Sequence, residues 1–181
     1  MYDGQSRILD VLRAFTGRDG EPKNEVESYM LKAMWLMMLS EFEASVKQKA
    51  ENYIDKIKKK DISNIHICLL IRHFHGNSED PLTANKIVGF YNKDPREISY
   101  RNFTKDKVPK YKTKAVEKLF NNMGIFFTSD ELTSLSILDS VASTRDSIAH
   151  GDINVQITRK ELEEQLHNLS ELTKMLEEKL I

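Results

Sequence analysis

Arg145 and His150 stand five positions apart and are the residues of this chain whose types best suit chemistry. Asp146 follows the arginine and Gly151 follows the histidine, at the end of an apolar-periodic segment. An arginine stays charged and can bind two phosphate oxygens at once. An imidazole has an unperturbed pKa of about 6.5 and can therefore donate or accept a proton near neutral pH. Such strong polar groups on a core-building helix need either partners or a function.

Helical geometry separates the two side chains. Five residues correspond to about 500° of rotation and about 7.5 Å of rise, so Arg145 and His150 point roughly 140° apart. Asp146 and His150 are four apart and share a face, where the carboxylate can orient the imidazole. Arg145 would reach around the helix or meet a partner subunit. In the alternative interpretation, the arginine and the histidine only cap the helix and pair with carboxylates of a bundle.

The segments that must position this motif have helical patterns. Ser129 and Asp130 are expected to cap a single site helix that ends before Gly151. A shorter helix over 114–123 should stop at Gly124. Thr158, with Glu161 three residues later, forms a capping-box signature for a last helix. That helix has a heptad-like seam with Thr173 in one slot, which suits a bundle; its leucines are Leu162, Leu166, Leu169, Leu176 and Leu180.

The apolar pattern of the N-terminal half predicts a helix over 6–15. It also predicts a long helix that begins at Asn24, with Glu27 as the capping-box partner, and runs toward residue 60. The long helix carries two apolar stripes on roughly opposite faces. The first comprises Val26, Met30, Ala33 and Met37, and the second Val46, Ala50, Tyr53, Ile54 and Ile57. Either the helix bends or breaks, with Ser40 as the bend, or it packs on both sides. The apolar character between residues 29 and 42 favours burial on several sides.

The middle of the chain is less regular. Residues 65–74 alternate like a strand but fit a short buried helix equally well, and we favour the helix because a strand lacks a partner. Residues 75–114 hold three of the four prolines and suggest an irregular insertion with one short helix near 85–91. We therefore expect a single all-α domain over 1–181, a bundle of four to six helices.

The composition limits the possible partners and the cellular compartment of the protein. The net charge of −1 gives no global basic field, so any polyanion must bind a local patch. The lone Cys68 excludes an intrachain disulfide and fits a reducing compartment, and no signal-peptide pattern opens the chain. The densest apolar run, 33–39, is far shorter than the roughly 20 residues of a membrane span. We expect a cytoplasmic protein without a membrane partner.

A second cluster lies in the insertion, where basic residues alternate with the aromatics Tyr100, Phe103 and Tyr111. Its cations include Arg101, Lys105, Lys107, Lys110 and Lys112. Such a pattern suits single-stranded RNA, although a solvated loop would look the same. A metal interpretation is suggested by His66, Cys68, His73 and His75, but no second paired set of ligands has zinc-site spacing. We expect no metal and no cofactor.

The stretch VASTRDSIAHGD, residues 141–152, resembles the signature of the HEPN superfamily, an Arg followed by a polar residue and, after a few more, by a His (R-x4-6-H). The frame is similar as well, because an apolar helix leads into the motif and a leucine-periodic helix follows it. Residues 39–44, LSEFEA, resemble the long HEPN helix that carries an acidic residue. The layout is most similar to stand-alone bacterial proteins of the RiboL-PSP group, with the insertion over 75–114 unmatched.

This resemblance implies a metal-independent endoribonuclease that acts as a homodimer through the Arg145–His150 helix. The RNA 2′-OH would attack the adjacent phosphate and leave a 2′,3′-cyclic phosphate and a 5′-OH. Arg145 would stabilise the phosphate, His150 would act as acid or base, and Asp146 would orient. The family more often has Asn or His after the arginine, so Asp146 adds a negative charge that either orients His150 or slows the enzyme.

By the same resemblance, the biological setting is a toxin or phage-defence effector, with a cognate antitoxin or a defence partner protein. Other members of the superfamily share the fold and lack activity. The second hypothesis is therefore a non-catalytic helical interaction module that serves as partner or regulator of another effector.

Overall fold

The computed structural model describes residues 7, 8, 10–12, 20–58, 71, 75, 80–92 and 112–180. These residues form an all-helical bundle without a strand, which confirms the expected fold class. Its labelled helices are α2 (Glu25–Lys58), α4 (Ala84–Tyr91), α6 (Thr113–Asn122), α7 (Ser129–Leu135), α8 (Ile137–Ala149) and α9 (Arg159–Lys179). The short helices expected near 85–91 and over 114–123 are confirmed as α4 and α6. The helix expected over 65–74 and most of the predicted insertion lie outside the described residues.

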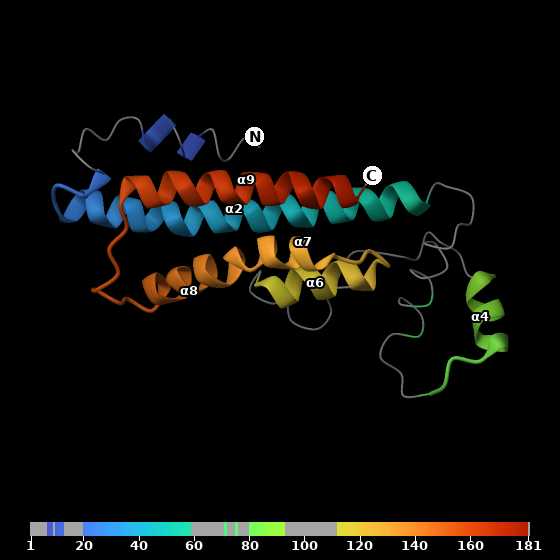
Figure 1. The fold of residues 1–181 in the computed structure, drawn as a ribbon. Helices are drawn as coiled ribbons and strands as arrows, with labels where there is room; N and C mark the ends of the chain where they lie inside the picture. Colours follow the sequence, from blue (N-terminus) through green and yellow to red (C-terminus); the bar gives the residue numbers. More distant parts are fainter. Residues whose placement is uncertain are drawn as a thin grey trace.

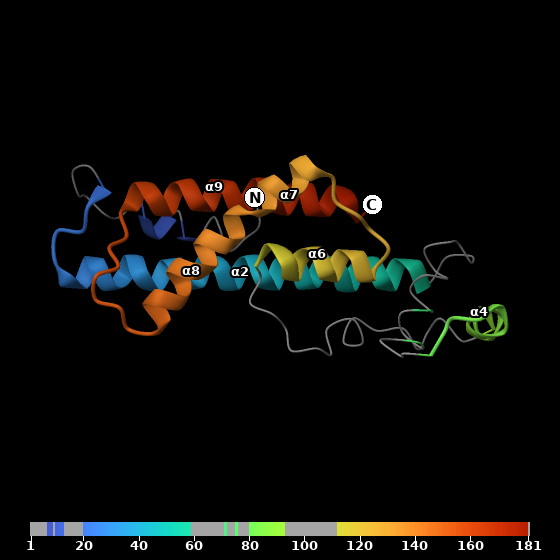
Figure 2. The ribbon, with the colours of Figure 1, turned by 60° about the horizontal axis from the view of Figure 1, so that its bottom comes forward.

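Two long helices form one layer of the bundle, and three short ones form the other. Helices α2 and α9 lie side by side and run in the same direction, while α6, α7 and α8 lie on one side of this pair (Figures 1 and 2). An ion pair of 2.8 Å between Lys49 Nζ and Glu177 Oε2 joins the later halves of the long helices. Helix α8 runs opposite to α2 and crosses it, which places the Arg145–His150 motif against the first half of α2.

The core lies between these layers. Helix α2 contributes one buried face, made of Leu31, Met34, Trp35, Met38, Leu39, Phe42, Val46, Ala50, Tyr53 and Ile54. The predicted leucine seam of α9 is confirmed, because all five of its leucines are buried. Thr173, the polar residue of the seam, is also buried, and its hydroxyl donates to the Leu169 carbonyl oxygen at 2.7 Å. That bond satisfies the one hydroxyl that the seam places in the core.

The first apolar stripe of α2 faces solvent, contrary to expectation. Val26 is 67% exposed, Met30 41% and Met37 55%, and Ala33 is exposed as well. Helix α2 is unbroken over its 34 residues, and its packed partners α8 and α9 both contact the opposite face. The prediction of a broken helix or of burial on several sides was therefore wrong. Methionine and alanine are strong helix formers, so their density there reflects helix propensity as much as burial.

Helix starts follow the predicted caps in two of three places. The Glu27 N–H donates to Asn24 Oδ1 at 3.0 Å, and the Glu27 carboxylate accepts from the Lys23 N–H instead of closing on Asn24. Thr158 and Glu161 form a complete capping box at the start of α9. At α7, however, the cap is Thr128, which forms a capping box with Glu131, and not the expected Ser129 or Asp130.

The predicted single site helix is divided at Ser136 into α7 and α8, which is a second correction. Three hydroxyls lie just before or at the division, those of Thr133, Ser134 and Ser136. Each donates to a backbone carbonyl three or four residues earlier, at 2.9, 3.1 and 2.6 Å. Such bonds compete with the helical ladder and bend it, so a run of hydroxyl residues interrupts a helix whose apolar period continues.

The pKa of Glu131 yields a pH prediction for this end of the bundle. A hydrogen bond from Lys179, 2.8 Å away, and one from the Thr128 N–H lower the pKa of that carboxyl. A lowered folded-state pKa contributes stability above the unfolded pKa and loses it as the pH falls through the folded value. Glu131→Gln should therefore flatten the loss of stability below about pH 4.5. Denaturant melts of both proteins between pH 3 and 7 test this, and parallel curves would contradict it.

Candidate functional site

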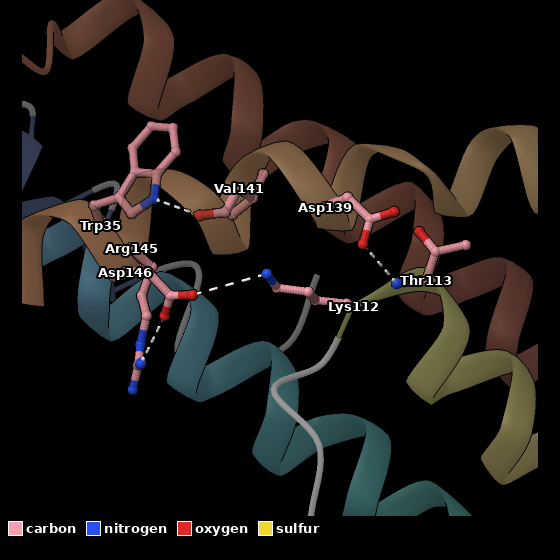
Figure 3. Close-up of polar contacts among 7 residues, drawn as sticks. All are labelled: Trp35, Lys112, Thr113, Asp139, Val141, Arg145 and Asp146. Atoms are coloured by element: carbon pink, nitrogen blue, oxygen red, sulfur yellow. Dashed lines mark hydrogen bonds and ion pairs between the residues drawn. The ribbon is translucent and has the colours of Figure 1, made fainter.

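Helix α8 is fixed to the core by apolar contacts and one buried hydrogen bond. Leu138, Val141 and Ala142 are buried on its inner side. The indole N–H of Trp35 on α2 donates to the Val141 carbonyl oxygen at 3.1 Å (Figure 3). Arg145 comes one helical turn after Val141, where the core ends, and its side chain is 42% exposed. The packing thus presents the arginine at the edge of the core.

The end of α8 has the geometry that Gly151 predicts. His150 is the C-cap residue, and Gly151 adopts a φ of +78°. The Gly151 N–H donates to the Ile148 carbonyl, and the Asp152 N–H donates to the Ser147 carbonyl, each at 3.0 Å. These two bonds form a Schellman motif. The exposed side chain of His150 is thereby carried by a fixed backbone turn.

Replacing Gly151 by alanine should destabilise the protein by about 1–2 kcal/mol, because an L side chain is strained at this positive φ. No steric conflict contributes, since a Cβ at Gly151 would meet no atom within 4 Å. The matched control is Gly89→Ala in α4, also in open space, which should be neutral or stabilising. Urea unfolding measures both, and equal effects would contradict the role of backbone strain.

Asp146 lies between two cations. Its Oδ1 is 3.2 Å from Nη1 of Arg145, and its Oδ2 is 3.8 Å from Nζ of Lys112 (Figure 3). The carboxylate is only 18% exposed, which strengthens both attractions. Its predicted role toward His150 stays a prediction.

Lys112 reaches this position because the start of α6 is anchored beneath α8. The Thr113 N–H donates to Asp139 Oδ1 at 3.2 Å, and the Thr113 hydroxyl donates to the Leu135 carbonyl at 2.8 Å. Lys112 precedes Thr113 as the N-cap residue of α6, so its ammonium group extends toward Asp146 (Figure 3). Sequence reasoning missed this anchor. The signal was the spacing of Asp139 and Asp146, two helical turns apart on one flank.

The structure describes only some of the residues predicted to bind RNA. Of the predicted RNA-binding residues, the structure places Lys112 at the motif, while Arg101, Lys105, Lys107 and Lys110 lie outside the described residues. In the described ranges, no group of three or more His, Cys, Asp or Glu side chains could hold a metal ion. Among the same residues, no helix is both long and apolar enough to cross a bilayer.

The cluster can bind an anion. The cluster of Arg145, Asp146 and Lys112 holds two cations and one carboxylate and so has a net charge of +1. A guanidinium presents five N–H donors, and Asp146 accepts a single described bond from Arg145. The other donors of that half-exposed side chain can bind phosphate oxygens, and the exposed imidazole of His150 ends the same helix.

Comparison with known proteins gives one result. Neither the curated proteins nor the solved structures include a match to this chain. A family model, RiboL-PSP-HEPN, matches residues 5–181, and that range includes both the Arg145–His150 motif and the helices that frame it. The helical bundle and the motif at the end of α8 agree with this match. The chain therefore belongs to the RiboL-PSP-HEPN family of the HEPN superfamily.

Proposed function

We propose that this protein is an endoribonuclease that cuts RNA at the Arg145–His150 motif without a metal ion. The observation that carries the proposal is the placement of a half-exposed Arg145 and an exposed His150 on the last turn and at the C-cap of one helix. Membership of the HEPN family, which is associated with RNA-related and nuclease functions, supports the same class of substrate.

The proposed reaction needs only what RNA and two side chains supply. A base removes the proton of the 2′-OH, a bond forms between that oxygen and the phosphorus, and the bond from phosphorus to the 5′-oxygen breaks. An acid protonates the departing oxygen, so the products are a 2′,3′-cyclic phosphate and a 5′-OH. His150 provides the proton transfer. The Arg145 guanidinium binds the non-bridging oxygens as negative charge grows on them.

A homodimer completes this site. Within one chain the two side chains point in different directions, so Arg145 of one subunit would act with His150 of the partner subunit. A two-fold axis beside α8 generates two such sites. Size-exclusion chromatography with light scattering at working concentrations tests this arrangement. A protein that is monomeric, with or without RNA, would contradict it.

Incubation of the purified protein with single-stranded RNA in EDTA tests the reaction. We expect cleavage to persist in EDTA, a cyclic phosphate on each upstream product, and no cleavage where a single 2′-deoxy nucleotide replaces the attacking one. Mass spectrometry identifies the end groups. Intact RNA under all conditions, or cleavage at the 2′-deoxy position, would contradict the proposal.

Asp146→Asn should tighten RNA binding by about two- to fivefold at low salt, because it removes a negative charge that pairs with Arg145 at 3.2 Å. The gain should shrink at 0.5 M NaCl, where salt screens the interaction. Fluorescence anisotropy with a DNA oligonucleotide, which the proposed chemistry cannot cut, measures the affinity. Asp130→Asn, exposed on the first turn of α7, serves as the control and should change nothing. Equal affinities of wild type and Asp146→Asn would contradict the prediction.

One observation favours the second hypothesis, a non-catalytic interaction module. The Asp146 carboxylate neutralises part of the charge of Arg145, at a position where the family more often has Asn or His. Expression in bacteria separates the hypotheses. An RNA-cutting toxin or defence effector slows growth and His150→Ala relieves it, whereas an interaction module has no such histidine-dependent effect.

A further inference from the structure

A groove of about 360 Å³ runs along the flank of α8 beside the motif. Its first wall is a hydroxyl face of α8 that includes Ser143, Thr144 and Ser147. Its second wall is formed by residues 155–157 and the first turns of α9, with the amides of Gln156 and Gln165. Trp35 of α2 also lines the groove. The walls come from three segments, and α8 leads directly into the motif.

The hydroxyls of this face are available to a ligand. Earlier on the same helix, the hydroxyls of Ser136 and Ser140 donate to the backbone carbonyls of Thr133 and Ile137. Among the contacts of the described residues, none occupies the hydroxyls of Ser143, Thr144 or Ser147. Each hydroxyl can donate one hydrogen bond and accept two.

The groove is built for an uncharged ligand. Among the described residues, its lining contains hydroxyls, amides and apolar side chains and no lysine, arginine or histidine. Its one carboxylate, Glu161, is held by the Thr158 N–H and hydroxyl, each at 2.8 Å. A phosphate would find no cation here, whereas the edge of a nucleobase carries the donors and acceptors that hydroxyls and amides satisfy.

The groove lies next to His150 on α8. Ser147 comes three residues before His150, about 4.5 Å away in helical rise and about 60° away in rotation, whereas Arg145 of the same chain lies on roughly the opposite side of the helix from the groove face. The chain that leaves His150 passes through residues 151–157 and returns as the opposite wall of the groove. A phosphate bound at His150 therefore places a neighbouring base at the groove, provided that the RNA is single-stranded and the base is unpaired.

We propose that this groove binds one unpaired nucleobase beside the cut phosphate and selects which base is accepted. This rests on the proposed ribonuclease function. The groove makes Thr144, Ser147 and Gln165 specificity residues, while Arg145 and His150 act on the phosphate.

Trp35 is the only tryptophan of the chain, so its fluorescence reports on the groove without any cleavage. The probes are RNA trinucleotides with abasic outer sugars and a central A, C, G or U, together with a fully abasic trinucleotide. The protein carries His150→Ala so that no probe is cut. We expect saturable fluorescence changes with the base-bearing probes, a spread of about tenfold between the best and the worst base, and no change with the abasic probe.

The double variant Thr144→Val and Ser147→Ala should weaken binding of the best base about tenfold. Gln165→Leu, on the opposite wall, should weaken it independently. The matched control, Thr133→Val and Ser134→Ala, removes two hydroxyls that bond within α7 and should leave binding unchanged.

Equal binding of the abasic probe, or equal binding by the double variant and its control, would overturn the groove proposal. Base-selective fluorescence changes, combined with no RNA cleavage by the unsubstituted protein, would contradict the proposed function and support the groove proposal. Conversely, cleavage that depends on His150, combined with no base selectivity, would contradict the groove proposal and support the proposed function.

Discussion

His150→Ala should lower the rate of RNA cleavage by about 10²–10⁴-fold, the usual contribution of a general acid or base. The side chain is exposed at the C-cap of α8, so its loss leaves the core intact and the melting temperature almost unchanged. Arg145→Ala should cost about 10²–10³-fold through lost charge stabilisation. The cleavage rate of Arg145→Lys should lie between those of the wild type and Arg145→Ala, because lysine keeps the charge but cannot bind two phosphate oxygens in the paired geometry of a guanidinium.

Single-turnover cleavage of one labelled RNA in EDTA measures these effects. His167→Ala, a substitution of an exposed histidine on α9, is the matched control and should cut at the wild-type rate. Arg145→Ala or His150→Ala proteins that cut as fast as this control would contradict the assignment of the site.

Mixing the two inactive variants tests the shared site directly. If Arg145 of one subunit acts with His150 of the partner subunit, a heterodimer of the two variants contains one fully wild-type site. Half of a random mixture is heterodimer, so activity should return to about one quarter of wild type. A site built within one chain would always contain one substitution, and the mixture would stay inactive.

Adjacent methionines on α2 should differ sharply in their effect on stability. Met38 is fully buried, and Met38→Ala should cost about 2–5 kcal/mol through lost burial and a residual cavity. Met37 is 55% exposed, and Met37→Ala should change stability by less than about 0.5 kcal/mol. For a chain of this size, the first change lowers the melting temperature by about 4–20 °C.

Calorimetry and urea unfolding of the two variants check this, and each variant is the control of the other because the chemical change is identical. Similar losses would mean that α2 is packed on both faces, as its sequence alone suggested. The expected cost of Met38→Ala is a large part of the stability of a typical domain. Met38→Ala therefore acts on the stability of the fold, whereas His150→Ala acts on chemistry alone.

Local signals predicted much of this fold. The leucine seam of α9, its capping box at Thr158 and the termination of α8 before Gly151 were all readable from spacing. Each depends on neighbours within one or two helical turns, so the sequence contains the whole cause. The prediction of a single site helix was wrong for a related reason. The hydroxyls around Ser136 bond to backbone carbonyls and interrupt the helix, but they do not change the spacing of its apolar residues.

Long-range contacts were beyond such reasoning. Both stripes of α2 are apolar, and only the packing of α8 and α9 on one side decides which is buried. Lys112 looked like one cation in a basic segment until the anchoring of α6 on Asp139 placed it beside Asp146.

The helical class and the position of Arg145 and His150 at a helix end could be predicted from the sequence, because these depend on residue types and short spacings. The resemblance of residues 141–152 and of their helical frame to HEPN proteins pointed to the family that the family model then matched. Only the tertiary structure decided that Asp146 is held between two cations, and that the hydroxyl face of α8 lines a groove. The physical reason is the same in both cases. Charges and hydroxyls on one helix acquire partners only when helices distant in the sequence pack against it, and no local pattern specifies which ones will.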